Sequence, residues 1–257
     1  TIFIQQENGT FSIEKFNGLE DTEGWYFKVV NKDMDGDGDQ DLIVGNLGLN
    51  YKYKASKEAP FEVYSHDFDA NGTSDIVLSY YEHGNMFPLR GRSCSIQQIP
   101  SLDQKFPTFE SFGEANLVDI YGDDLASALH LQAKTFASYY IENIDGKSFK
   151  KHKLPQLAQV SSINAIITDD FDKDGKQDIL ISGNLYASEI ETPRNDAGVG
   201  LFLKGNGNGD FEVIPLNNSG FFAPHDAKDM KPLLLAGKKV ILVANNDHFI
   251  QLFAISP

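Results

Sequence analysis

Three acidic stretches of this chain carry oxygen-bearing side chains at alternating positions, a spacing suited to binding a metal ion. The stretches run from Asp33 to Asp41, from Asp67 to Asp75 and from Asp170 to Asp178. Each has Asp or Asn at positions 1, 3, 5 and 9 and glycine at position 6. Alternate oxygens that converge on one point, with a glycine that permits a sharp turn, form the pattern that calcium requires. The sequence therefore predicts one Ca²⁺ site in each loop.

Each loop is expected to supply nearly all of the ligands of its ion. Position 9, the first residue of an apolar run, is expected to give the closing carboxylate. Position 7 differs widely between the copies and is expected to contribute only its backbone carbonyl, at Asp39, Thr73 and Lys176. The candidate ligands are Asp33, Asp35, Asp37, Asp39 and Asp41 in the first loop, Asp67, Asp69, Asn71, Thr73 and Asp75 in the second, and Asp170, Asp172, Asp174, Lys176 and Asp178 in the third.

Other interpretations of the loops fit the spacing less well. Asp and Gly favour ordinary turns without any metal, but carboxylates crowded into so short a turn repel one another strongly unless a cation is present. Magnesium is less suited than calcium because it prefers to keep its waters. An EF-hand needs flanking helices and a Glu at position 12, whereas position 12 here is Val44, Leu78 or Ile181.

The elements that must position these loops are short β-strands. Apolar, β-branched and aromatic runs precede and follow each loop, and such runs are typical of buried strands. A second repeating unit, a hairpin with a Gly turn followed by Phe, is expected at residues 1–13, 139–150 and 201–214. One loop unit and one hairpin together supply the four strands of a propeller blade. Residues 226–255 predict a last blade without ligands, with strands at 232–235, 240–244 and 249–255.

One segment interrupts the β pattern. Residues 97–132 contain Pro100, Pro107 and helix-like stretches such as 123–129. We expect a helical insertion here, between the second and third strands of the second calcium blade. It is either an interaction surface or a cap over apolar surface.

Composition excludes some classes of protein and favours others. The formal net charge of the 257 residues is −15, and three Ca²⁺ ions would bring it to −9. This sign argues against a nucleic-acid partner, which needs clustered Lys and Arg. No apolar stretch reaches the roughly 20 residues of a transmembrane helix. The single Cys94 excludes an internal disulfide, and calcium loops of this kind suit an extracellular, bacterial setting.

The motifs resemble the FG-GAP/VCBS repeats of integrin-α-like β-propellers. The likeness lies in the D-x-D-x-[DN]-G-x-x-D loops, in the Asn8-Gly9-Thr10-Phe11 hairpin, and in the stretches Gly45–Asn50 and Gly183–Glu189. These two stretches are similar to the C-terminal part of bacterial surface proteins related to the cartilage acidic protein and UnbV group. The resemblance implies an all-β propeller of seven or eight blades, continued by blades upstream of Thr1. Four to five blades are expected within a single domain, residues 1–257. Their approximate bounds are residues 1–18 (partial), 19–58, 59–157 with the insertion at 97–132, 158–220 and 221–257.

The expected function is that of a non-enzymatic, calcium-stabilised binding module at the bacterial cell surface or outer membrane. No catalytic motif is present, and the unidentified partner is expected to be a protein or a glycan. Two polar stretches are candidate binding rims: 80–83 with Arg90 and Arg92, and 189–196. The alternative is a carbohydrate-active enzyme, a polysaccharide lyase or hydrolase on a calcium propeller scaffold. Its candidate residues are Tyr80, His83, Glu189, Glu191 and Arg194.

Overall fold

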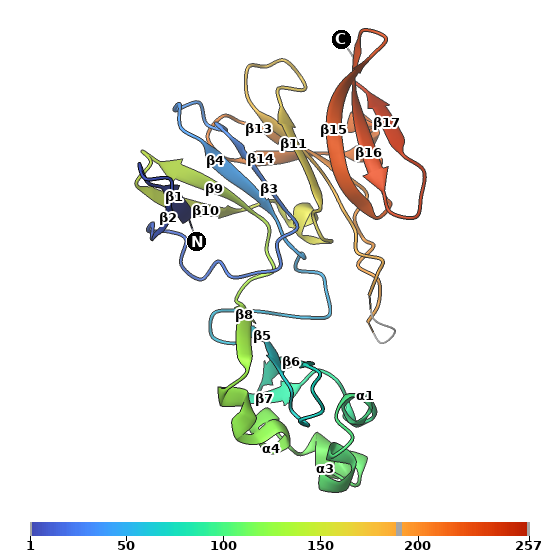
Figure 1. Cartoon of the computed structure of the whole chain (residues 1–257). Helices are drawn as coiled ribbons and strands as arrows, with labels where there is room; N and C mark the ends of the chain where they lie inside the picture. Colours follow the sequence, from blue (N-terminus) through green and yellow to red (C-terminus); the bar gives the residue numbers. More distant parts are fainter. Residues whose placement is uncertain (1, 189–191, 256–257) are drawn as a thin grey trace. The chain divides into compact units, whose positions relative to one another are not determined.

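The computed structural model describes residues 2–188 and 192–255, and it is mostly β, with several antiparallel sheets and a few short helices (Figure 1). The chain forms two compact units. The first unit contains residues 1–20, 25–52 and 136–257, and the second contains residues 21–24 and 53–135. Among the described residues, no helix has both the length and the apolar character needed to cross a lipid bilayer.

The first unit contains one hairpin and three larger sheets. The hairpin pairs β1 (Ile2–Gln5) with β2 (Phe11–Glu14). The next sheet has the strand order β10-β9-β4-β3, from β3 (Lys28–Lys32), β4 (Asp41–Gly45), β9 (Tyr139–Ile144) and β10 (Ser148–Lys153). The third is β11 (Ala165–Asp169), β12 (Asp178–Ser182), β13 (Leu201–Gly205) and β14 (Phe211–Ile214), in chain order. The last is β15 (Ala227–Leu235), β16 (Lys238–Asn245) and β17 (Gln251–Ala254). Two short helices connect these sheets, η2 (Gln156–Gln159) and α5 (Leu216–Ser219).

The β11–β14 sheet contributes side chains to two cores of the first unit. Successive residues of a strand point to opposite faces of its sheet. Ile179 and Ile181 therefore pack in one core with Ile43 and Tyr140 of the β3–β4–β9–β10 sheet. Leu180, between them, packs in the other core with residues of β15 and β16 such as Met230, Ile241 and Val243. The unbroken apolar run of β12 is thus explained by burial on both faces.

The second unit is one sheet with helices packed against it. The strand order is β7-β6-β5-β8, from β5 (Phe61–His66), β6 (Asp75–Glu82), β7 (Asn85–Pro88) and β8 (Leu129–Ala133). The helices are α1 (Arg92–Gln98), α2 (Leu102–Lys105), α3 (Phe109–Gly113), α4 (Leu117–Tyr121) and η1 (Gly122–Ala126). Leu117 and Ile120 of α4 pack with Tyr64 and Val77 of the sheet in one core. The helices therefore cover apolar surface of this sheet.

The grouping of strands into sheets agrees with the expectation in one place and differs in another. The third loop unit and its hairpin form one four-stranded sheet, β11–β14, as expected. The hairpin at 139–150 does not belong with the second loop, however, because β9 pairs with β4 and places Ile141 opposite Leu42. This pairing buries Tyr140 completely.

The placement of the helical segment also differs from the expectation. The helices lie between the third and fourth strands of the second unit, β7 and β8, and not between its second and third strands. A tight turn at His83 and Gly84, both with positive φ, joins β6 directly to β7. The edge of β5 is then free to pair with β8, which follows the helices.

Candidate metal centres

Each of the three predicted loops joins two neighbouring antiparallel strands. They lie between β3 and β4, between β5 and β6, and between β11 and β12. In each case the residue at position 9 is paired with the residue that precedes position 1, as in Asp169 opposite Asp178. The ladder therefore closes immediately below the loop and holds its two ends together.

The three loops follow the same backbone path. Position 6 has a positive φ in every copy, at Gly38, Gly72 and Gly175, and glycine adopts this conformation without steric cost. Position 4 is also left-handed in every copy, but two of these residues are Ala70 and Lys173. A non-glycine residue in this conformation costs about 1–2 kcal/mol. The loop shape is therefore kept even where the local sequence opposes it.

Hydrogen bonds from the loop backbone hold the carboxylates in matching orientations. The position 1 carboxylate accepts from the amide of the position 6 glycine at 3.2, 2.8 and 2.9 Å in the three loops. The position 9 carboxylate accepts from the amide of position 2 at 3.0 Å in all three. The position 3 carboxylate accepts from the amide of position 5 at 3.2 Å in all three. These repeated contacts turn the side chains towards the loop interior.

This arrangement gathers three carboxylates in each loop. One oxygen from each member lies within 4.8 Å of the others in the groups Asp33, Asp35 and Asp37; Asp67, Asp69 and Asp75; and Asp170, Asp172 and Asp178. The position 7 side chain of Asp39 is outside the group of the first loop. Asp41 and Asp174 are also outside these groups, although both belong to the predicted ligand sets. A set of carboxylate oxygens fits a hard divalent cation such as Ca²⁺.

The electrostatics of the loops also fit a bound cation. Burial, followed by the neighbouring carboxylates, raises the pKa of Asp35 and of Asp39. Burial likewise raises the pKa of Asp178, to which the charges of Asp172 and Asp174 add. In addition, Asp39 Oδ1 is buried and has no hydrogen-bond partner among the residues that the structure describes. A divalent cation would offset both the desolvation of these charges and their mutual repulsion.

The surroundings of the first and third loops differ in charge. In the third loop, Lys204 of β13 pairs with Asp172 and lies 3.0 Å from Asp174. The Lys204 side chain is the main reason that the pKa of Asp174 lies below its usual value. In the first loop, Asp41 accepts a hydrogen bond from the Asn143 amide at 2.8 Å, as Asp178 does from the Gly205 amide at 2.9 Å, and another from the Tyr140 hydroxyl at 3.0 Å.

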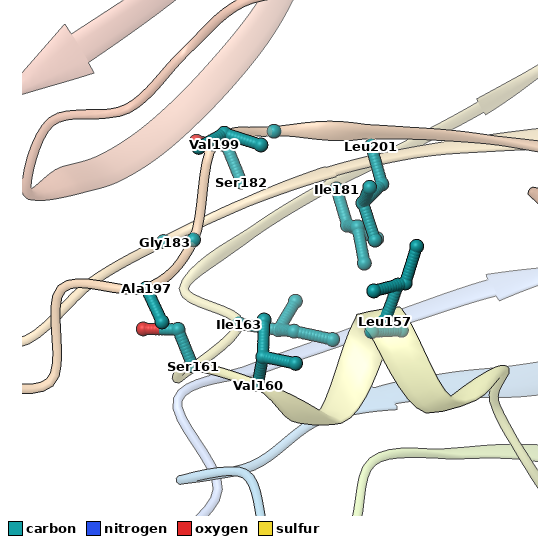
Figure 2. A pocket seen from close by; sticks show the side chains of 13 residues that line it. Leu157, Val160, Ser161, Ile163, Ile181, Ser182, Gly183, Ala197, Val199 and Leu201 are labelled. Carbon is teal, nitrogen blue, oxygen red and sulfur yellow. The ribbon is translucent and has the colours of Figure 1, made fainter. Parts of the chain in front are cut away.

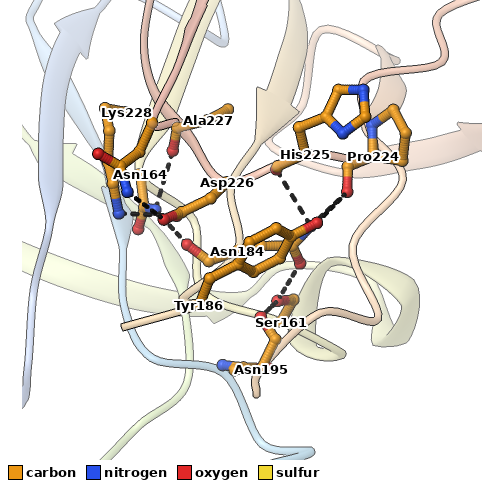
Figure 3. A network of polar contacts seen from close by, with 11 residues as sticks. Ser161, Asn164, Asn184, Tyr186, Asn195, Pro224, His225, Asp226, Ala227 and Lys228 are labelled. Carbon is orange, nitrogen blue, oxygen red and sulfur yellow. Dashed lines mark hydrogen bonds and ion pairs between the residues drawn. The ribbon is translucent and has the colours of Figure 1, made fainter. Parts of the chain in front are cut away.

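Two asparagines that follow the loop strands bind together segments that are distant in sequence. Asn184 is completely buried, and its Nδ2 donates to the carbonyls of Gly198, Pro224 and His225 at 2.9, 2.9 and 3.1 Å (Figure 3). Its Oδ1 accepts from Ser161 Oγ at 2.6 Å.

Asn46 has the equivalent place after the first loop unit. It is also completely buried, accepts from the Trp25 amide at 3.1 Å and donates to the Ala137 carbonyl at 3.1 Å. The repeated Gly-Asn-Leu at 45–47 and 183–185 was the signal for this role. Sequence reasoning used it only as a mark of resemblance.

A second polar cluster, which the sequence did not reveal, surrounds Glu62 in the second unit. Glu62 is 2% exposed and accepts from the hydroxyls of Tyr64 at 2.5 Å and Tyr81 at 3.3 Å and from Gln132 Nε2 at 3.2 Å. His130 Nε2 lies 2.8 Å from the same carboxylate, and its ring stacks on Tyr64. Burial, and then Glu62, raise the pKa of Tyr64, so its hydroxyl remains a donor. The cluster links β5, β6 and β8.

The residues proposed for a binding rim or an enzyme site are divided between the two units. Tyr80 packs against Phe87, and Arg92 pairs with Asp103 and donates to the Phe106 carbonyl. These residues and His83 belong to the second unit, whereas Arg194, whose guanidinium lies 4.8 Å from the Tyr186 ring centroid, belongs to the first. Glu189 and Glu191 lie outside the described residues.

The first unit also contains a small apolar cavity of about 120 Å³ (Figure 2). Side chains such as Leu157, Ile163, Ile181 and Leu201 line it, together with Ser161 and Ser182. The described residues that line it carry no ionisable side chain.

The three acidic loops are therefore the arrangement on this chain with the clearest chemical capacity, which is to bind divalent cations. Comparisons of the sequence with models of known protein families and with curated proteins found no match.

Proposed function

We propose that this chain is a calcium-stabilised, non-enzymatic binding module of an extracellular or cell-surface bacterial protein, with a protein or a glycan as its partner. The observation that carries the proposal is the threefold repetition of one loop, with matching turns and with the position 1 and position 3 carboxylates gathered in every copy. Chance explains a single acidic turn more easily than three with the same hydrogen-bond pattern. Calcium is the cation that suits such an all-oxygen cage.

The role proposed for calcium is structural. Each ion would join the start of one strand to the loop that leaves its neighbour, and the position 9 carboxylates at the base of the loops are almost fully buried. An ion that binds only the folded chain stabilises it by mass action, about 2.7 kcal/mol at 100 times the dissociation constant. The loops supply nearly all of the ligands themselves, which leaves no open position for a substrate.

The architecture we propose is an FG-GAP/VCBS-type β-propeller. Two features support it. In the first unit, successive antiparallel sheets pack face to face through two apolar cores. In addition, the third loop lies between the first two strands of a four-stranded sheet, which is the composition expected of a blade.

Calcium titration of the chelated protein tests this function. Isothermal titration calorimetry should give three Ca²⁺ per chain, and magnesium at the same concentration should bind more weakly. Absence of calcium binding would overturn the proposal. Incubation with acidic and neutral polysaccharides tests the non-enzymatic part, since new reducing ends or unsaturated products would establish a carbohydrate-active enzyme instead.

A further inference from the structure

A lysine ammonium group lies against the carboxylates of the third loop. Lys204 is on β13, which pairs with β12 directly beside the loop. Its Nζ pairs with Asp172 Oδ2 and lies 3.0 Å from Asp174 Oδ2. Both partners belong to the predicted ligand set, so an internal cation already shares the oxygens that would bind the metal.

The first loop has the opposite charge in the equivalent place. The Gly205 amide donates to Asp178 at 2.9 Å, and the Asn143 amide donates to Asp41 at 2.8 Å, so Gly205 and Asn143 correspond. The residue before each is therefore Lys204 in one sheet and Glu142 in the other. Glu142 contacts His152 at 2.7 Å and Lys150 at 3.5 Å.

We propose that Lys204 is a built-in competitor for calcium, which holds the third loop closed when calcium is scarce and gives it a lower calcium affinity than the first loop. This inference rests on the proposed calcium function. A bound ion must displace the ammonium group or tolerate its positive charge at close range, and either event weakens binding.

The two roles of Lys204 predict effects of opposite sign. Without calcium, the lysine offsets the repulsion between Asp172 and Asp174, so its removal should destabilise the fold. With calcium, its removal should raise the affinity of the third loop and enlarge the stabilisation that calcium gives. A lysine with only a structural role would lower the stability in both conditions by the same amount.

The test compares the wild-type chain with Lys204→Met and, as a matched control, Lys173→Met. Lys173 is within the same loop and is not a predicted ligand, and among the described residues it forms no ion pair with the loop carboxylates. Both variants thus remove one positive charge, but only one of them removes the contact. Calcium is titrated while the backbone amide signals of Gly38 and Gly175, which donate to position 1 of the first and third loops, are followed by ¹H–¹⁵N NMR.

In the wild type, the Gly38 signal should respond at lower calcium concentration than the Gly175 signal. Lys204→Met should lower the midpoint of Gly175 by about tenfold, which corresponds to about 1.4 kcal/mol, without moving that of Gly38. In chelator, the melting temperature of Lys204→Met should lie below that of the wild type. The rise in melting temperature on adding calcium should be larger for Lys204→Met than for the wild type.

Three results would overturn the inference. An unchanged or higher Gly175 midpoint in Lys204→Met would show that the lysine does not compete. An equal decrease in Lys173→Met would show that only net charge matters. If calcium moves neither glycine signal, the calcium function itself fails, and this inference fails with it.

Discussion

Replacement of Asp41 by Asn should remove most of the calcium-dependent stability that the first loop provides. Asp41 is completely buried. Its Oδ2 accepts from the Met34 amide and the Tyr140 hydroxyl, both at 3.0 Å, and its Oδ1 accepts from the Asn143 amide at 2.8 Å. An Asn side chain keeps the shape but loses the charge, and its amide group must face one of these donors. The loss of a hydrogen bond to a charged group costs about 1.5–3 kcal/mol.

The free energy of unfolding should therefore fall by about 1.5–3 kcal/mol in chelator. In calcium at 100 times the dissociation constant of this loop, a further 2.7 kcal/mol or so of binding energy is lost. The total decrease in calcium is then about 4–6 kcal/mol. Urea denaturation with and without calcium measures both quantities.

The matched control is Asp145→Asn, in the β9–β10 turn. This variant removes an acidic charge near the loop without removing a predicted ligand, so its gain from calcium should stay close to that of the wild type. If Asp41→Asn gains as much from calcium as the wild type, position 9 is not a calcium ligand and the proposed coordination is wrong.

Three other changes test separate parts of the structure. In Asp69→Asn, calcium should slow hydrogen exchange at the amides of β5 and β6 less than it does in the wild type, while its effect on the amides of β12 should be unchanged. An equal loss of calcium protection in both places would contradict the independence of the loops. Asn184→Ala should destabilise the chain by about 3 kcal/mol or more in urea, because it leaves several buried polar groups unpaired; a change below about 1 kcal/mol would contradict the role assigned to this network. In chelator, the raised pKa values of Asp35, Asp39 and Asp178 mean that the folded chain keeps protons that the unfolded chain releases above about 3.8. The free energy of unfolding should therefore fall as the pH rises above that value, and added calcium should abolish this fall. Urea denaturation at a series of pH values measures the free energy of unfolding. The same fall in the presence of calcium would be evidence against the sites.

The loops were predictable because every feature that defines them is local. The candidate ligands, the glycine and the two strands lie within one short segment, so their spacing in the sequence determines their arrangement in space. The β11–β14 sheet was predictable for a related reason, since its four strands follow one another along the chain.

Features that depend on distant pairings were not predictable in the same way. No local pattern indicates that β9 returns to β4 after residues 53–135 have formed a separate unit. The contact of Lys204 with Asp172 spans 32 positions, and that of His130 with Glu62 spans 68. Both arise from strand pairing and become visible only when the register of the sheets is known.

A crystal structure grown in millimolar calcium would test the central claim most directly. Anomalous difference density should show one ion in each of the three loops, with oxygens of the position 1, 3 and 5 side chains about 2.3–2.6 Å away. Empty loops, or ions bound elsewhere on the chain, would contradict the assignment of these loops as calcium sites.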